Sequence, residues 1–214
     1  MKPRVLPDDA EGRAAAIEIL QAGGVVALPT DTVYGLAASL AVPGAVARLF
    51  DVKHRPVERG ILLLLADQAQ AEVIAVLTPA AVALADAFWP GGLTVVLQQR
   101  ASVALPDALT GGARTVGLRV PDHASPRALA AAIGPLPTTS ANLSGFPEAR
   151  DAGEILSQFG DAIDLVLDGG PAIGGRPSSV VDCSARPPRV LRSGAIPTQQ
   201  IAAILSKAGI DLGV

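Results

Sequence analysis

The chain has little of what disulfide and metal chemistry require. Its 214 residues include one cysteine, Cys183, and two histidines, His54 and His123. A single cysteine excludes an intrachain disulfide and a metal site built from several cysteines, and two histidines argue against a zinc site. No base or metal partner of His123 is evident in its loop, so we interpret this histidine as structural or exposed. No metal site is predicted.

Charge and long apolar runs are also scarce. Charged residues make up 17% of the chain and the net charge is −3, so the whole chain is not a polycation. The strongest apolar run, at 61–66, is far shorter than the roughly 20 residues that cross a bilayer. The first nine residues lack the apolar region of a signal peptide. We therefore expect a cytoplasmic protein with no membrane association.

Half of the residues are apolar, which is typical of a chain that folds around a core, and the length fits one domain over residues 1–214. Capping and periodicity signals predict helices at 9–21, 43–53, from about 67, 79–89, 125–133, 151–159 and 197–208. Short apolar runs predict strands at 25–28, 61–65, 93–98, 115–120, 165–167, 180–182 and 190–191. Helices and strands interleave without strict βαβ order. We therefore expect an α/β fold with a twisted sheet of mixed direction and flanking helices.

The most informative segment follows the strand predicted at 25–28. Three hydroxyls, one carboxylate and a glycine lie within six residues, namely Thr30, Asp31, Thr32, Tyr34 and Gly35. Small polar groups at a strand end are typical of ligand sites in open α/β sheets. A capped turn uses the same residue types. Taken alone, this segment leaves both interpretations open.

A basic cluster follows the helix predicted at 43–53. Lys53, Arg55 and Arg59 could neutralise a polyphosphate, lysine as a point charge and arginine as a planar fork. Basic residues at a helix C-terminus also complement the helix dipole while they remain solvated. Pro56 ends the helix and argues in part against this simpler interpretation.

Arg119 stands at the end of another predicted strand. An arginine there is commonly a surface residue, and its best functional partner is a ligand carboxylate, which it binds through two parallel hydrogen bonds. Other chemistry-bearing residues are Thr115, the hydroxyl-amide loop at 138–145, and Ser178 and Ser179 with Arg192.

Common catalytic and nucleotide-binding motifs are missing from the sequence. It has no Ser-His-Asp order, Cys-His pair, acidic metal cluster or Gly-x-x-x-x-Gly-Lys-Ser/Thr loop. Gly169-Gly170 and Gly174-Gly175 have no following helix and do not make a dinucleotide fingerprint. The residues by themselves therefore predict an α/β protein with an anion-binding groove, and they do not predict a reaction.

Seven short motifs occur in order and resemble one known family. They lie at 29–36, 53–56, 89–94, 119–123, 140–145, 178–182 and 191–194, and read PTDTVYGL, KHRP, WPGGLT, RVPDH, SANLSG, SSVVD and LRSG. Together they closely resemble the YrdC-like threonylcarbamoyl-AMP synthases from about residue 8 to 197. The likeness is to the short bacterial type without a C-terminal extra domain, and it implies a YrdC/RibB-like fold with a concave ligand groove.

The resemblance implies a nucleotidyltransferase reaction. L-Threonine, bicarbonate or CO2, and ATP would give threonylcarbamoyl-AMP and pyrophosphate, and the product would feed the t6A modification at position 37 of tRNA. The implied partners are therefore these three substrates, the downstream threonylcarbamoyl-transferase proteins and a weak contact with tRNA or other RNA. Mg2+ would bind through the ATP phosphates, without a metal site on the protein.

The resemblance also assigns residues. The threonine side would be formed by Thr32, Arg119, Ser140 and Ser178. The ATP side would be formed by Lys53, Arg55, Arg59, Thr115, Asn142, Arg150 and Arg192. The catalytic group would be Lys53, Arg55, Ser140 and Asn142. It gives no role to Asp31 or Tyr34.

Three positions depart from the pattern of many family members. Arg59 stands for a second lysine, Gly60 for a proline, and Leu64 where a histidine that contacts threonine would fall; Gly60 and the missing histidine are typical of the short bacterial subtype. Two alternatives stay open. One is a double-stranded RNA-binding or ribosome-associated protein, against which the net charge of −3 and the lack of basic runs with aromatics argue. The other is a YrdC-like paralogue that serves a different acyl-adenylate or carbamoyl step.

Overall fold

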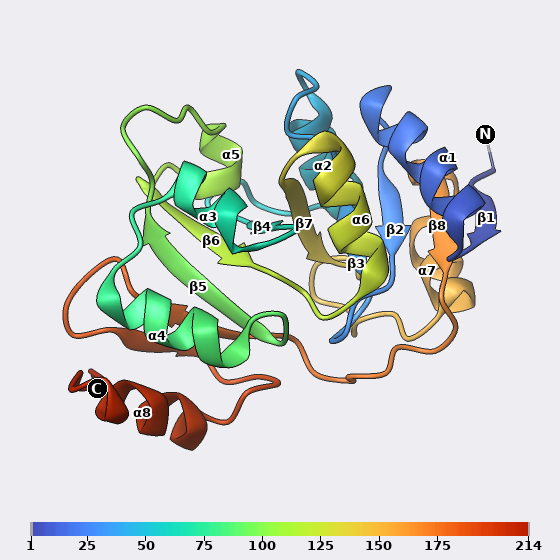
Figure 1. Cartoon of the computed structure of the whole chain (residues 1–214). Helices are drawn as coiled ribbons and strands as arrows, with labels where there is room; N and C mark the ends of the chain where they lie inside the picture. The colour runs from blue at the N-terminus through green and yellow to red at the C-terminus, as the bar shows by residue number, and fades with distance from the viewer. Residues whose placement is uncertain (1, 214) are drawn as a thin grey trace.

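Ten strands form one sheet in the computed structural model, which describes residues 2–213 (Figure 1). Its strand order is β1-β8-β2-β3-β7-β4-β6-β5-β9-β10. The strands are β1 (Arg4–Pro7), β2 (Val26–Leu28), β3 (Gly35–Ala37), β4 (Leu62–Leu64), β5 (Leu93–Gln98), β6 (Thr115–Arg119), β7 (Leu136–Ser140), β8 (Leu165–Asp168), β9 (Ser179–Asp182) and β10 (Arg189–Arg192). The first and last residues of the predicted domain lie outside the described part of the chain.

Several helices begin where the sequence offers a capping side chain. Asp9, Asp67, Thr78 and Asp151 each accept a hydrogen bond from a backbone N–H in the first turn of the helix that follows. The helices are α1 (Ala10–Gln21), α2 (Ala45–Lys53), α3 (Gln68–Ile74), α4 (Pro79–Phe88), α5 (Asp107–Thr110), α6 (Ala124–Ile133), α7 (Ala152–Phe159) and α8 (Thr198–Lys207), with a 3-10 turn at Gly160–Ala162. Among residues 2–213, no helix is both long and apolar enough to span a bilayer.

The sheet is mixed, as predicted. The pairs β1–β8, β2–β8, β4–β6 and β5–β9 are parallel, whereas β2–β3, β3–β7, β4–β7, β5–β6 and β9–β10 are antiparallel. The connection between β8 and β9 joins strands near opposite ends of the strand order. Residues 169–178 therefore cross from one half of the sheet to the other.

Two apolar clusters hold helices against the sheet. One contains Leu20 of α1 and Leu129 of α6 with Leu28 and Leu165 of the strands, and α1 and α6 pack side by side on this face (Figure 1). The other, larger cluster includes residues of α2, α4, α7 and α8 and the alternate positions of the central strands, such as Leu118. Burial of these fully enclosed side chains, at about 25 cal/mol per Å² of apolar surface, is the main force that positions the strands.

Apart from the 3-10 turn, four elements were not among the predicted ones, namely β1, β3, β7 and α5. In the hairpin β2–β3, only the first strand, β2, was predicted. The second strand, β3, has the sequence Gly-Leu-Ala and directly follows a polar turn, so no alternation of apolar and polar residues marks it. β7 ends in Thr138, Thr139 and Ser140, which carry hydroxyls where most strands carry apolar groups. Strand β7 is held by backbone hydrogen bonds to β3 and β4, a tertiary contact that its local sequence does not predict.

Candidate active site

One cavity of about 410 Å³ lies on the central strands. Its lining includes alternate residues of adjacent strands: Leu62 and Leu64 of β4, Thr94 and Val96 of β5, and Thr115, Gly117 and Arg119 of β6. Residues two apart on a strand share one face of a sheet, so these side chains belong to one face. The residues between them, such as Leu63, Val95 and Leu118, belong to the larger core cluster. The same strands therefore carry a core on one face and a small-molecule site on the other.

The structure brings together seven of the residues that the resemblance assigns. The seven that line this cavity are Thr32, Arg55, Thr115, Arg119, Ser140, Ser178 and Arg192. They come from the turn after β2, the loop after α2, and strands β6, β7 and β10 with the residue before β9. Sequence positions up to 160 residues apart therefore meet in one place, as the groove predicted from the resemblance requires.

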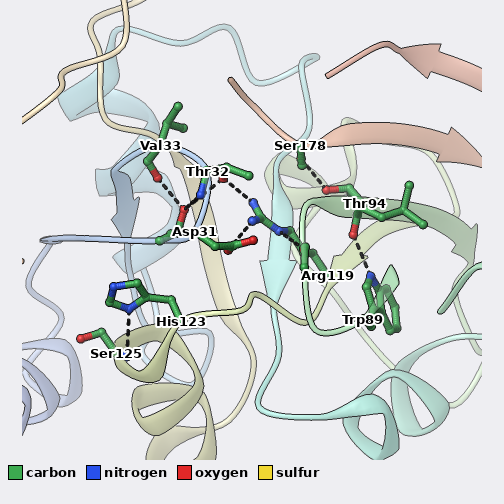
Figure 2. Close-up of polar contacts among 12 residues, drawn as sticks. Asp31, Thr32, Val33, Trp89, Thr94, Arg119, His123, Ser125 and Ser178 are labelled. Carbon is green, nitrogen blue, oxygen red and sulfur yellow. Dashed lines mark hydrogen bonds and ion pairs between the residues drawn. The ribbon is translucent and has the colours of Figure 1, made fainter. Parts of the chain in front are cut away.

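Arg119 is the central cation of this cavity. It is 3% exposed, and its guanidinium donates hydrogen bonds in three directions (Figure 2). Nε lies 2.9 Å from the carbonyl oxygen of Gly91, Nη1 lies 2.8 Å from Oγ1 of Thr32, and Nη2 lies 2.5 Å from Oδ1 of Asp31. A guanidinium has five N–H groups, so two are not used by any residue at 2–213. Two N–H groups are the number that a carboxylate needs for bidentate pairing.

The hydroxyl of Thr32 can only accept a hydrogen bond from a ligand. Thr30 Oγ1 donates to the carbonyl oxygen of Val33 at 2.6 Å, so its single proton is used. In the 3.0 Å contact between the two threonine hydroxyls, Thr32 must therefore be the donor. Thr32 Oγ1 accepts from Arg119 and keeps one lone pair. A ligand amine or hydroxyl that donates a hydrogen bond suits this lone pair.

Asp31 was not assigned a role from the sequence, yet it forms the shortest contact of Arg119. Its side chain is 17% exposed, and its carboxylate pairs with the guanidinium. Asp31 is not part of the cavity lining. No sequence pattern marks this pair, because the two residues lie on different strand ends and only the sheet order brings them together.

Lys53 lies behind Ser140. Its Nζ donates to the carbonyl oxygen of Ser140 at 2.5 Å, to Ser140 Oγ at 2.9 Å and to Asn142 Oδ1 at 3.1 Å. Burial, with a smaller contribution from Arg55, lowers the pKa of Lys53 to about 7. Ser140 lines the cavity, whereas Lys53 and Asn142 do not. These two predicted residues therefore support the wall of the cavity in this structure.

Arg55 and Arg59 differ in their surroundings. Arg55 lines the cavity, and its guanidinium donates to the carbonyl oxygens of Arg59 at 2.7 Å and Gly60 at 2.9 Å. Burial and the neighbouring Arg59 and Arg192 lower the pKa of Arg55. Arg59 is exposed and lies outside the cavity lining. A cation whose pKa is lowered by burial and by neighbouring cations is typical of a site that receives an anion.

Arg192 reaches the cavity through an irregularity of β10. The pairing with β9 shifts register between Val190 and Arg192, and both Leu191 and Arg192 line the cavity. Consecutive residues of a regular strand point to opposite faces, so the bulge is what brings both to this site. Arg192 donates to the carbonyl oxygen and the hydroxyl of Ser178 at 3.0 and 3.1 Å. Ser178 also contacts Thr94 at 2.8 Å (Figure 2).

Arg150 does not join the cavity. Its side chain is 81% exposed and pairs with Glu154, four residues further along at the start of α7. Arg150 therefore lies outside the cavity lining, and its contact with a nucleotide stays a prediction. Thr138 and Thr139 of β7 also line the cavity; they lie in the segment 138–145 that the sequence marks as chemistry-bearing, but the resemblance gives neither of them a role.

Tyr34 anchors the segment that crosses the sheet. Its hydroxyl donates to the carbonyl oxygen of Gly170 at 2.7 Å and accepts from the N–H of Gly169 at 3.0 Å. Further along this segment, Gly174 packs on the turn after β2: a Cβ there would lie 2.4 Å from the carbonyl oxygen of Asp31. The crossing segment thus holds the turn that contains Asp31 and Thr32.

His123 has a structural role, as interpreted from the sequence. It caps α6, and its Nδ1 accepts a hydrogen bond from the N–H of Ser125 at 3.2 Å (Figure 2). This contact requires Nδ1 to be unprotonated, and burial lowers the pKa of His123. Among residues 2–213, no group of three or more histidine, cysteine or acidic side chains could hold a metal ion.

Fold and site together define an α/β protein whose sheet carries a small-molecule cavity rich in arginines and hydroxyls. The Sua5/YciO/YrdC family model, with the description "Telomere recombination", matches residues 18–194. The chain belongs to this family, and the resemblance predicted from the seven motifs is confirmed.

Two curated relatives carry the name threonylcarbamoyl-AMP synthase. The protein of Pyrococcus abyssi is 36% identical over 201 residues, which cover 93% of this chain and 58% of the relative. The protein of Bacillus subtilis is 36% identical over 203 residues, which cover 94% of this chain and 58% of the relative. The chain therefore spans less than two thirds of the length of these relatives.

Solved structures agree on the fold. The crystal structure of P. abyssi Sua5 complexed with L-threonine has a TM-score of 0.90 and 33% identity, and the match covers 100% of this chain and 63% of that one. The crystal structure of Escherichia coli YciO has a TM-score of 0.80 and 29% identity, and the match covers 91% of this chain and 96% of that one. The predicted mixed α/β fold is confirmed.

Proposed function

We propose that the chain is an L-threonylcarbamoyladenylate synthase, a nucleotidyltransferase that makes threonylcarbamoyl-AMP and pyrophosphate from L-threonine, bicarbonate or CO2, and ATP. The observation that carries the proposal is the meeting of Arg119 and Thr32 with Arg55 and Arg192 in one cavity. An amino acid needs partners for its carboxylate and amine, which Arg119 and Thr32 offer, and a triphosphate needs nearby cations, which Arg55 and Arg192 offer. The names of the relatives and the threonine bound to one neighbour support the same reaction.

On the threonine side, Arg119 would bind the substrate carboxylate with its two remaining N–H groups. Thr32 would accept a hydrogen bond from the substrate amine or hydroxyl, because it has a lone pair and no free proton. Ser140 and Ser178 would complete this side. The contacts of Ser178 with Thr94 and Arg192 hold its hydroxyl in place.

On the nucleotide side, Arg55 and Arg192 would neutralise the phosphates, and Thr115 would line the nucleotide. Lys53 and Asn142 would act at the same wall through Ser140. Arg59 and Arg150, which are exposed and outside the cavity lining, would have to reach a bound nucleotide from outside it. Mg2+ would arrive with the ATP phosphates, since the described residues offer no cluster of metal ligands.

The chemistry needs positioning more than a protein base. The nitrogen of threonine would form a bond to the carbon of CO2 and release a proton, which gives a carbamate. A carbamate oxygen would then attack the α-phosphorus of ATP, and the bond to the β-phosphate oxygen would break as pyrophosphate leaves. Holding the reacting groups in line is worth up to about 7–11 kcal/mol in such reactions, and fixed cations stabilise the charge that develops.

The product would be passed to threonylcarbamoyl-transferase proteins for t6A modification of tRNA, and we propose that this takes place in the cytoplasm. The test of the reaction is the fate of the carbon atom. Incubation with 13C-bicarbonate, L-threonine and ATP should give one labelled adduct of threonine and AMP by mass spectrometry. AMP formation without incorporation of the label would contradict the proposal.

A further inference from the structure

We propose that Asp31 is a positioning residue that holds the Arg119 guanidinium in the orientation needed for the substrate carboxylate. This inference rests on the proposed function and extends it to a residue outside the cavity lining. Asp31 would act through Arg119 and would not touch the substrate itself.

The contacts of Arg119 carry the argument. Its three bonded atoms are held from two separate segments: the turn after β2 supplies Asp31 and Thr32, and the turn before β5 supplies the carbonyl of Gly91 (Figure 2). A planar group held at all three nitrogens cannot rotate about Cδ–Nε without breaking a contact. The two unused N–H groups therefore keep fixed directions, which lowers the entropy lost when a ligand binds.

Only one of these three acceptors carries a charge. Gly91 and Thr32 offer neutral oxygens, whereas Asp31 offers a carboxylate at 2.5 Å. Hydrogen bonds between charged groups are roughly twice as strong as neutral ones, so Asp31 contributes the strongest of the three restraints. Arg119 is also nearly fully buried, and an unpaired buried charge is costly. Asp31 offsets this cost in the free protein.

The turn that contains Asp31 is itself restrained. Gly174 of the crossing segment packs against the carbonyl oxygen of Asp31 and the Cα of Thr32. Thr30 closes the turn through Val33 and the N–H of Thr32. The carboxylate therefore stands on fixed backbone, as a positioning residue requires.

Two roles of Asp31 can be separated by substitution. If Asp31 mainly positions Arg119, Asp31→Asn should retain function, because the amide oxygen has the same reach and can accept from Nη2. If Asp31 mainly reduces the positive charge of the site, Asp31→Asn should bind threonine more tightly, since the substrate carboxylate would meet an uncompensated guanidinium. Our proposal predicts the first behaviour.

The experiment measures threonine-dependent pyrophosphate release and the KM for each substrate in the full-length variants. Asp31→Ala should raise the KM for threonine about tenfold or more, as expected for loss of a charged hydrogen bond, and should leave the KM for ATP within about twofold. Asp31→Asn should stay within about threefold of the wild type. Asp164→Ala is the matched control, because Asp164 pairs with Arg48 and neither residue lines the cavity. This control should leave both KM values unchanged.

The outcomes distinguish the inference from the proposed function. An inactive wild-type protein, which releases no pyrophosphate in response to threonine, overturns both. An active wild type overturns the role of Asp31 alone if Asp31→Ala keeps the wild-type KM for threonine, if Asp31→Asn binds threonine more tightly, or if both KM values rise equally. Should Asp31→Ala fail to fold, Asp31→Asn and Asp31→Ser are compared instead. Serine is too short to reach Nη2, so Asp31→Ser should behave as the alanine variant is expected to.

Discussion

The ammonium group of Lys53 and the main-chain carbonyl of Ser140 are 2.5 Å apart, and the same nitrogen also reaches the Ser140 hydroxyl and Asn142. In the other direction, the carbonyl oxygen of Lys53 accepts from the N–H and the hydroxyl of Ser144. Lys53 therefore clamps the loop that follows β7 from both its side chain and its main chain. A residue usually considered for its charge here fixes one wall of the cavity.

The lowered pKa of Lys53 gives a pH dependence of stability. The group has a pKa of about 7 in the folded protein and 10.5 as a free side chain, so the unfolded chain binds more protons between these pH values. Stability then rises as the pH increases through this window. In urea unfolding, the wild type should gain roughly 2 kcal/mol more than Lys53→Met between pH 7 and 9. If the free energy of unfolding changes equally with pH in both proteins, this prediction is wrong.

Substitution of Arg119 should separate the two substrates. Arg119→Lys keeps a positive charge beside Asp31, but a lysine cannot form the planar, two-point contact with a carboxylate. We expect the KM for threonine to rise by about tenfold or more while the KM for ATP changes little. Arg119→Ala should show the same order of effects. Equal losses of threonine and ATP binding, measured by calorimetry, would contradict the assignment of Arg119 to the carboxylate.

The basic loop after α2 should act on turnover. Arg55 lines the cavity and fixes its own loop through the carbonyls of Arg59 and Gly60. Arg55→Ala should mainly lower kcat, whereas Arg59→Ala, at an exposed position, should lower it less. Steady-state kinetics at saturating threonine gives both values. Wild-type turnover in Arg55→Ala would remove Arg55 from the phosphate side.

Substitution of two neighbouring residues of the crossing segment should affect threonine affinity differently. A Cβ at Gly174 would meet the backbone of Asp31 and Thr32 at 2.4–2.7 Å, so Gly174→Ala must move the segment or the turn. The side chain of Ile173 is 87% exposed, so Ile173→Ala removes nothing that packs. We expect Gly174→Ala to bind threonine more weakly than the wild type and Ile173→Ala to bind threonine with the wild-type affinity. Similar affinities in the two variants would show that the segment does not hold the turn.

Much of the fold could be predicted because its elements carry strong local signals. Capping residues such as Asp9 and Asp151 and apolar runs such as that of β5 announce their elements without tertiary context. β3 and β7 give no such signal, since a Gly-Leu-Ala strand and a hydroxyl-rich strand form through pairing with each other and with β2 and β4. Their pairing is what places Ser140 beside the turn after β2.

The sequence predicted many of the residues that form the site, but fewer of the contacts between them. Family motifs identified Arg119, Thr32 and Ser178, which do meet in the cavity. They could not reveal that Asp31 pairs with Arg119 or that Lys53 lies behind Ser140, because both relationships depend on the strand order and on side-chain direction. For Arg150, the family resemblance implied a contact with the nucleotide, whereas in the structure its side chain pairs with Glu154, four residues further along the chain.

Pyrophosphate release tests the central claim most directly. The protein is mixed with ATP, Mg2+ and bicarbonate, and release is compared with L-threonine, with L-serine and without an amino acid. Our account predicts release that depends on threonine, with a smaller response to serine, because one methyl group is worth only about 1–3 kcal/mol of discrimination. Release at the same rate with and without threonine, or no release under any of the three conditions, would contradict it.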